Sequence, residues 1–401
     1  MNPSPFIIPC ADRVAKLPPY VFATIFKMKE EALAADKRVI DLGVGNPDGR
    51  ASANVIAALN QAMNDADWNC HGYSTFKGLP RFREAIAAWY YNRFVVNLDP
   101  ETETLPLIGS KEGLANLMRA YLNAGDTVII PSPCYPAYFG AARLCEAEIF
   151  EPPLAEENGF VLDFGSIPAA VAARARMLIL NYPHNPTGGV CDLEFMAAAV
   201  AWCRRHGVML VSDIAYSELG FEPDNDPPSV LQVPGAKDVA VEFQSLSKSH
   251  NMAGWRTGFA VGGAEVIGNL ARVKSNVDFS LFGAIQMAAV EALTGSQSVC
   301  RDNRALYQRR RNLMVAGYRK LGWQVPSPPA TMYIWARIPS AYGDDDFRFV
   351  SEVFAASGVL LSPGSGFGVH GAGYARTSLV VDQEGIAKVM ARLEKTQIPW
   401  S

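Results

Sequence analysis

The sequence predicts an α/β protein in which a large domain with a mostly parallel, doubly wound sheet is followed by a smaller α+β domain. In the middle of the chain, short apolar or β-branched runs alternate with helix-length amphipathic segments, as such sheets require. From about residue 296 onward, the sequence instead shows one long helical pattern and strands of antiparallel character. The chain of 401 residues is long enough to bury a large core and to form two domains.

Strands and helices of the large domain follow from the length and period of each apolar run. The resulting elements are a loop and helix at 107–124, a strand entering a turn at 126–133, a strand at 176–182 ending in the turn PHNPTGG, a helix from about Leu193 to His206, and strands at 208–213, 238–248 and 257–263. This alternation places helices on both faces of the sheet.

The small domain is predicted from the change of pattern after the sheet. A long helix with a basic face covers residues 301–322, and the strand MYIWARI follows at 332–338. Its arginine-rich stretch, Arg304 to Arg319, is interpreted as a solvated helix face and not as a binding patch. The N-terminal segment up to about Arg50 is expected to join this domain. The predicted division is an N-terminal arm and part of the small domain at 1–50, a large domain at 51–295, and a small C-terminal domain at 296–401.

Composition and charge exclude several classes of partner. A net charge of −4 gives no reason to expect binding to nucleic acid or to an anionic membrane surface. No apolar run approaches the roughly 18 residues of a transmembrane helix, and the N-terminus has no pattern of a secretory signal. The seven cysteines are scattered without a C-x-x-C pair, and the five histidines do not cluster. We therefore expect reduced thiols, no metal site and a cytoplasmic location.

Polar side chains follow three of the predicted strands where each strand ends. In open α/β sheets, ligands bind beyond the carboxyl ends of the strands. These side chains are therefore expected to meet at one edge of the sheet: Asn185 after the strand at 176–182, Asp213 and Tyr216 at the end of the next strand, and Ser245, Ser247 and Lys248 at the end of the one that follows.

This combination fits pyridoxal 5′-phosphate, which needs an amine for its aldehyde, an anion at its ring nitrogen and a donor at its phenolic oxygen. Lys248 supplies the amine. Asp213 keeps the ring nitrogen protonated, because an adjacent carboxylate favours the cationic form. Tyr216 and the amide of Asn185 donate hydrogen bonds to the phenolic oxygen and stabilise it as an anion. Lys248, Asp213 and Tyr216 are therefore the predicted catalytic residues.

The cofactor's phosphate and ring are assigned to a second group of residues. The hydroxyls of Ser245 and Ser247 and the planar guanidinium of Arg256 donate to the phosphate. Backbone N–H groups at Gly109, Ser110 and Lys111 open a predicted helix, and helix N-termini attract phosphate. Tyr135, in the loop after the strand DTVII, is placed to stack on the ring.

At these residues the chain resembles a known family, the fold-type I, class I and II aminotransferases. The resemblance covers essentially the whole chain and rests on the following segments: DLGVGNPDG at 41–49, HGYSTFKGLPRFREAIAAWY at 71–90, IGSKEGL at 108–114, NPTGG at 185–189, SDIAYSE at 212–218, SLSKSHNMAGWRTGF at 245–259, and SPGSGFG at 362–368 followed by Arg376. LPPYVF, GNPDG, HGYS and SLSKS-NMAGWR look like the branch that holds bacterial alanine transaminases and LL-diaminopimelate aminotransferase-like enzymes.

The resemblance implies the roles given above and adds others. Arg376, with the backbone of Gly45 and with Asn185, would bind the α-carboxylate of the substrate. Tyr73 would reach the cofactor's phosphate from a partner subunit, in a homodimer with active sites at the interface. Residues 274–286 depart from the family pattern, because the arginine with which some relatives bind a distal carboxylate has no clear counterpart there.

The function implied is transfer of an amino group between an L-amino acid and a 2-oxo acid. Alanine with 2-oxoglutarate is the first expectation, and LL-diaminopimelate or another amino acid with 2-oxoglutarate is the alternative. A β-lyase or synthase on the same fold shares the cofactor residues and remains a rival. A transcription regulator with such an effector domain would need an added DNA-binding domain, but the aminotransferase pattern begins near residue 15. The loop GSGFG is interpreted as a bend that positions Arg376, and His184 and His250 receive no role.

Overall fold

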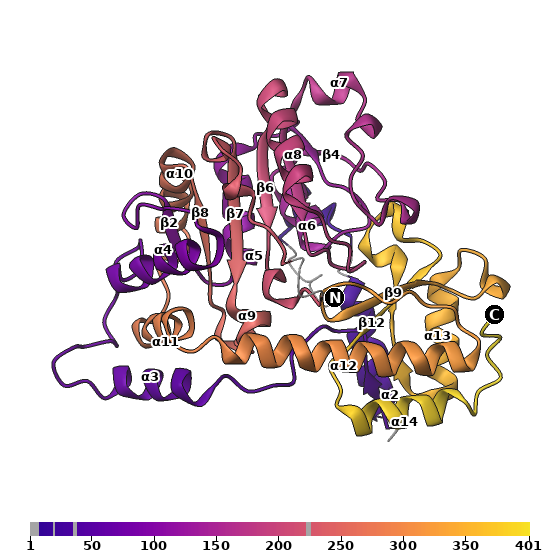
Figure 1. Cartoon of the computed structure of the whole chain (residues 1–401). Helices are drawn as coiled ribbons and strands as arrows, with labels where there is room; N and C mark the ends of the chain where they lie inside the picture. The colour runs from indigo at the N-terminus through magenta and orange to yellow at the C-terminus, as the bar shows by residue number, and fades with distance from the viewer. Residues whose placement is uncertain (1–7, 19–20, 35–37, 222–225) are drawn as a thin grey trace, which may run out of the picture.

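The computed structural model describes residues 8–18, 21–34, 38–221 and 226–401. Part of the predicted N-terminal arm, including Pro19 and Tyr20 of the LPPYVF segment, lies outside the described residues. Figure 1 shows a large sheet with helices around it and a smaller group of strands beside it. None of the described helices combines the length and the apolar composition that crossing a membrane requires.

The large sheet has seven strands in the order β2-β8-β7-β6-β5-β3-β4. Their bounds are β2 Thr104–Leu107, β3 Thr127–Ile129, β4 Glu148–Phe150, β5 Ala175–Asn181, β6 Met209–Asp213, β7 Ala240–Ser245 and β8 Gly258–Gly262. Only β8 runs antiparallel to its neighbours, β2 and β7, among the described pairings of this sheet. The predicted α/β class with a mostly parallel, doubly wound sheet is confirmed.

The central strands bury both of their faces, on which successive side chains point to opposite sides of the sheet. In β6, Val211 packs in one core with α5, α6 and α10, whereas Leu210 packs in another core with α4, α8 and α11. The covering helices are α4 Pro80–Phe94, α5 Ser110–Tyr121, α6 Ala137–Leu144, α8 Leu193–His206, α10 Ala264–Ser275 and α11 Gly283–Thr294, while α3 Ala53–Met63 packs on α11. The near-continuous apolar runs of the central strands therefore reflect a sheet covered on both faces.

The smaller group of strands forms two further sheets. Strand β12 Tyr374–Ser378 lies between β11 Ser362–Pro363 and β9 Tyr333–Arg337 and is antiparallel to both. Strand β1 Ile40–Asp41 pairs with β10 Val359–Leu360, so a segment near the N-terminus joins the C-terminal part of the chain. The associated helices are α2 Val21–Ala34, α12 Ser298–Leu321, α13 Asp346–Ser357 and α14 Gln383–Leu393.

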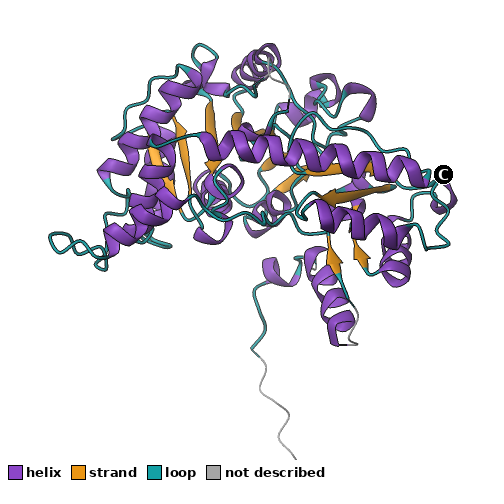
Figure 2. Ribbon diagram, turned by 60° about the horizontal axis from the view of Figure 1, so that its bottom comes forward, coloured by secondary structure: helices purple, strands orange, loops and turns teal. Residues whose placement is uncertain are grey.

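Helix α12 does not present its arginines as a solvated face, so that prediction is wrong for its centre. Figure 2 shows this long helix passing across both groups of strands. Arg310 and Arg311 are 5% and 8% exposed. Arg310 donates to both carboxylate oxygens of Asp48, each at 2.7 Å, and Arg311 donates to the carbonyl of Pro328 at 2.8 Å. Arg310 is therefore ion-paired and Arg311 is hydrogen-bonded, as burial of their charges requires.

Candidate active site

A cavity of about 240 Å³ lies at the carboxyl ends of β5, β6 and β7. The predicted cofactor and substrate residues that line it are Gly45, Ser110, Lys111, Tyr135, Asn185, Asp213, Tyr216, Ser245, Ser247, Lys248, Arg256 and Arg376. Val44, Tyr138, Asn181, Ala215, Ala253 and Tyr333 complete the lining, and Tyr73 does not belong to it. Residues from distant parts of the sequence meet here because parallel strands bring their carboxyl ends to one edge.

Lys248 enters this cavity from a short helix, α9 Leu246–Ser249, directly after β7. Ser245 begins the helix by accepting a hydrogen bond from the backbone N–H of Ser247 at 3.2 Å. Lys248 Nζ donates to the carbonyl of Gly45 at 2.5 Å. Burial lowers the pKa of Lys248, and the cations Arg376 and Arg256 lower it further, against an opposing effect of Tyr333. A lowered pKa leaves more of the amine neutral, which is the form that attacks an aldehyde.

Asp213 is a buried carboxylate at the end of β6. Tyr138 donates to its Oδ2 at 2.7 Å, and the backbone N–H of Ala215 donates to its Oδ1 at 3.2 Å. Burial raises the pKa of Asp213 to about 6, although both hydrogen bonds oppose that shift. A cationic ring nitrogen placed beside this carboxylate would stabilise its charged form.

The phosphate end of the predicted site is a helix N-terminus beside an arginine. Gly109 precedes α5 with a φ of 73°, and no side chain caps the N-terminus of this helix. A Cβ at Gly109 would lie 2.5 Å from a guanidinium nitrogen of Arg256, so only glycine allows this approach. A phosphate group could accept hydrogen bonds from the uncapped backbone N–H groups of α5, from the guanidinium of Arg256 and from the nearby hydroxyls of Ser245 and Ser247. The residues present therefore fit the predicted cofactor.

Arg376 lies on β12 and is 1% exposed. Its two terminal nitrogens donate to Asn185 Oδ1 at 2.8 Å and to the carbonyl of Gly43 at 2.6 Å. Its guanidinium carbon lies 4.2 Å from the ring centre of Tyr333 and 4.5 Å from that of Phe367. Phe367 belongs to the predicted bend, which forms a 3-10 turn over Gly364–Phe367, so the bend does pack against Arg376. These contacts fix the plane of the guanidinium.

Arg376→Lys is expected to raise KM for the amino acid and for the 2-oxo acid by roughly 10- to 100-fold, because an ammonium loses the two-pronged carboxylate contact. Steady-state kinetics with both substrates measure this change. The same kinetics with an amine that lacks a carboxylate are the control. An equal loss with that amine would show that Arg376 supports only the fold.

Three polar residues of the cavity escaped the sequence analysis. Asn181 donates to the carbonyl of Asp213 at 2.7 Å and accepts from the backbone N–H of Asn185 at 2.9 Å. It stands at the end of β5, so the strand-end argument applied to Asn185 would have found it. Tyr138 lies in the first turn of α6, three residues after Tyr135, and the centres of the two rings are 5.6 Å apart. Tyr333 sits within an apolar strand, where nothing in the local sequence marks it.

Tyr73 and residues 274–286 lie outside the cavity of their own chain. The Tyr73 side chain is 95% exposed, and its ring lies 5.5 Å from that of Phe279 in an edge-on contact. Lys274 is fully buried between Glu112 Oε2 at 3.2 Å and Asp278 Oδ1 at 2.5 Å. Lys274 therefore supports the start of α5 and does not replace the arginine that some relatives use for a distal carboxylate.

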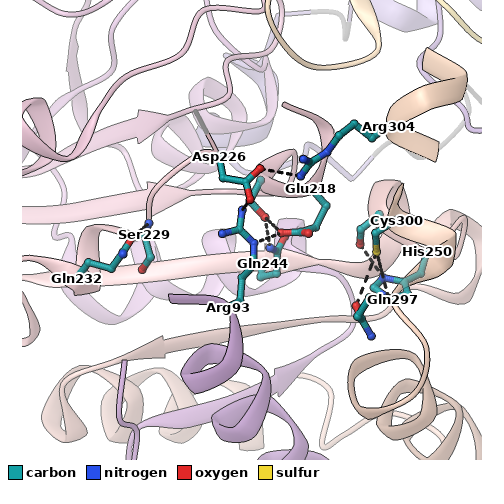
Figure 3. A network of polar contacts seen from close by, with 12 residues as sticks. Arg93, Glu218, Asp226, Ser229, Gln232, Gln244, His250, Gln297, Cys300 and Arg304 are labelled. Carbon is teal, nitrogen blue, oxygen red and sulfur yellow. Dashed lines mark hydrogen bonds and ion pairs between the residues drawn. The ribbon is translucent and has the colours of Figure 1, made fainter. Parts of the chain in front are cut away.

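A polar network supports the turn that carries Tyr216. Gln244, the residue before Ser245, donates to the hydroxyl of Ser217 at 2.7 Å. Figure 3 shows Arg93 beside Glu218 and Asp226, with Arg304 reaching Asp226. The corresponding N–O distances are 3.0 Å, 3.6 Å and 2.9 Å. Arg93 of α4 thus pairs with both Glu218 and Asp226, and Arg304 of α12 pairs with Asp226.

A family model described as aminotransferase class I and II matches residues 37–393 of this chain. The LL-diaminopimelate aminotransferase of Nitratidesulfovibrio vulgaris (strain DP4) is 43% identical over 385 residues, which cover 96% of this chain and 98% of that relative. The relative of the same name from Halothermothrix orenii is 41% identical over 390 residues, which cover 97% of this chain and 99% of the relative.

Solved structures are similar over nearly the whole chain. The substrate-bound structure of BacF from Bacillus subtilis has a TM-score of 0.94 at 36% identity, covering 98% of this chain and 99% of that chain. A probable N-succinyldiaminopimelate aminotransferase from Thermus thermophilus has a TM-score of 0.87 at 37% identity, covering 94% and 99%. Both similarities extend over the large sheet and the C-terminal strands.

Proposed function

Since the chain belongs to the class I and II aminotransferases and uses pyridoxal 5′-phosphate, we propose that it transfers an amino group from LL-diaminopimelate to 2-oxoglutarate. The observation that carries this choice is the shared name of the curated relatives, which align with almost the full length of this chain. The relatives described above are not named for alanine, so they support the second predicted donor better than the first. The relatives reported by name are aminotransferases, so they favour that activity over the β-lyase and regulator hypotheses.

The residues that would hold the cofactor are those predicted from the sequence. Lys248 would bind the aldehyde, Asp213 the ring nitrogen, and Tyr216 and Asn185 the phenolic oxygen. Tyr135 would stack on the ring, and Arg256 would bind the phosphate with the two serines and the start of α5. When bound, the cofactor supplies a carbonyl that receives the amino group and a ring that withdraws electrons from the substrate's Cα.

Lys248 has a second proposed task besides holding the cofactor. Its Nζ then moves the proton that leaves the substrate's Cα, for which a neutral amine is required. Burial in this cavity and the nearby arginines favour that neutral form. Arg376 and the backbone of Gly45 orient the substrate by its α-carboxylate, so that the Cα proton faces Lys248. These residues bind any α-amino acid and do not choose among side chains.

A single-turnover screen of amino donors tests the substrate choice. The holoenzyme is mixed with one amino acid at a time and no oxo acid, and the loss of the cofactor's visible band is followed. LL-diaminopimelate is expected to react with a higher ratio of rate to apparent Kd than alanine, glutamate or aspartate. A higher ratio for alanine would contradict this choice and support alanine as the amino donor. No reaction with any amino acid would contradict aminotransferase activity itself.

We further propose that the enzyme is a homodimer and that an exposed apolar patch forms part of its interface. This interface patch consists of Tyr73, Phe76, Val277, Phe279 and Phe282, which are between 38% and 95% exposed. Its two segments are held together by a hydrogen bond from Gln286 to Ser74 at 3.1 Å. Contiguous exposed aromatic side chains of this kind are typical of protein–protein contacts. The patch includes Tyr73, so dimer formation would deliver its hydroxyl to the partner's site.

Co-expression of Lys248→Ala and Tyr73→Asp subunits is expected to restore about a quarter of wild-type activity. Random pairing makes about half of the dimers mixed, and each mixed dimer then has one intact site and one doubly damaged site. Activity of the whole co-expressed population measures this recovery, and mixed dimers purified through two tags should reach about half of wild-type activity, given that Tyr73→Asp alone is folded, dimeric and poorly active.

The matched control pairs Lys248→Ala with Asp213→Asn. Both residues line the cavity of one chain, so each site of such a mixed dimer keeps one lesion and no recovery is expected. If the Tyr73 pair also shows no recovery, Tyr73 does not serve the partner's site.

A further inference from the structure

Tyr333 lies where three groups of the proposed active site meet. It comes from β9 in the smaller group of strands, whereas Tyr216 and Lys248 follow strands of the large sheet. Its hydroxyl lies 2.9 Å from the hydroxyl of Tyr216, and both side chains are buried. Its ring lies beneath Arg376, with the guanidinium carbon 4.2 Å from the ring centre.

The hydroxyl of Tyr333 is also packed against the backbone that receives Lys248. A Cβ at Gly45 would lie 2.1 Å from the Tyr333 hydroxyl oxygen, so a larger residue at position 45 would displace Tyr333. The carbonyl of this same Gly45 accepts the hydrogen bond from Lys248 Nζ. One side chain thus contacts the proposed ligand of the phenolic oxygen, the proposed carboxylate ligand and the backbone support of the lysine.

Either of the two tyrosine hydroxyls could donate in the contact between them. Each hydroxyl carries a single proton, and in the proposed role of Tyr216 that proton goes to the cofactor's phenolic oxygen. Tyr333 must then donate to Tyr216, so that the proton of Tyr216 is left for the cofactor.

We propose that Tyr333 is a positioning residue with two separable tasks: its hydroxyl directs the Tyr216 proton to the cofactor's phenolic oxygen, and its ring holds the plane of Arg376. The inference rests on the proposed roles of Tyr216 and Arg376. The inference also links these two roles. A carboxylate that binds Arg376 would act on the ring of Tyr333, and the hydroxyl of the same side chain orients Tyr216. Carboxylate binding and the electronic state of the cofactor are then coupled through Tyr333.

Two substitutions in the holoenzyme separate these tasks. Tyr333→Phe keeps the ring and removes the hydroxyl, so the cofactor's visible band should titrate at a pH higher by roughly half a unit to one unit, with KM nearly unchanged. The midpoint pH of this titration rises because a weaker hydrogen bond to the phenolic oxygen leaves the imine nitrogen more basic. Tyr333→Leu removes the ring as well and should raise KM for both substrates by roughly 2- to 30-fold, as expected for a lost cation–π contact. Thermal unfolding of each variant checks that the fold is intact.

A mutant cycle with Tyr216→Phe decides whether the hydroxyl acts through Tyr216. Tyr216→Phe alone should raise the midpoint, and Tyr333→Phe should add no further shift in that background. If Tyr333→Phe leaves the midpoint pH unchanged while Tyr216→Phe raises it, the inference is wrong and the proposed site is unaffected. If Tyr216→Phe also leaves the midpoint unchanged, both the role of Tyr216 and the inference are wrong. Equal rises of KM in Tyr333→Phe and Tyr333→Leu overturn the task given to the ring.

Discussion

Lys248→Ala is expected to lower kcat by at least about 10³-fold, because the variant lacks the amine that we propose binds the cofactor and moves the Cα proton. The cofactor should still bind, since Arg256, the two serines and the start of α5 hold its phosphate independently of Lys248. Turnover with saturating pyridoxal phosphate measures the effect, and the absorbance of the dialysed protein reports retained cofactor.

Lys320→Ala is a matched control for the loss of one lysine. Its side chain is 77% exposed on α12 and pairs with Glu394 away from the cavity. Activity within a factor of about two of wild type is expected for a surface pair of this kind. A Lys248→Ala variant that kept activity within tenfold of wild type would contradict the assigned base.

Asp213→Asn has the second largest expected effect, a loss of roughly one to three orders of magnitude in kcat. A neutral amide does not keep the ring nitrogen protonated, so the ring withdraws electron density from the substrate less strongly. The phosphate contacts are unchanged, so the Kd of the cofactor should change far less than kcat. Fluorescence titration of the apoprotein and saturating kinetics measure the two quantities separately.

Tyr138→Phe is the control for the surroundings of Asp213. It removes the 2.7 Å hydrogen bond to the carboxylate and keeps the charge. A much smaller loss of kcat than that of Asp213→Asn is expected. Turnover of Asp213→Asn near wild type in saturating cofactor would show that the charge at this position is not used.

The strand-end residues were predictable because one physical rule places them. Asn185, Asp213 and Lys248 each follow a strand of a parallel sheet, and such ends share one edge. Helix α8 was also predicted to the residue, since both of its ends are marked. Asp192 caps its start by accepting from the backbone N–H of Phe195, and Gly207 ends it with a φ of 67°.

Contacts between segments that are far apart in the sequence were harder to predict from local sequence patterns. Arg376 and Gly45 entered through a family resemblance, because nothing local brings β12 to the end of β5. Tyr333 was missed for the same reason, as its polar partners lie on other elements. The arginines at the centre of α12 were misjudged, because helical periodicity gives no sign that a second surface covers that side. The segment at 238–248 was predicted as one strand, yet β7 ends at Ser245 so that Lys248 turns into the cavity.

Reduction of the holoenzyme with borohydride tests the central claim most directly. Borohydride converts the carbon–nitrogen double bond between the cofactor and its lysine into a stable single bond, and peptide mass mapping then locates the modified residue. We expect one modified lysine, Lys248, in the peptide that contains SLSKSHN. A label on Lys111, the other lysine of the cavity, or on a lysine elsewhere in the chain would contradict it.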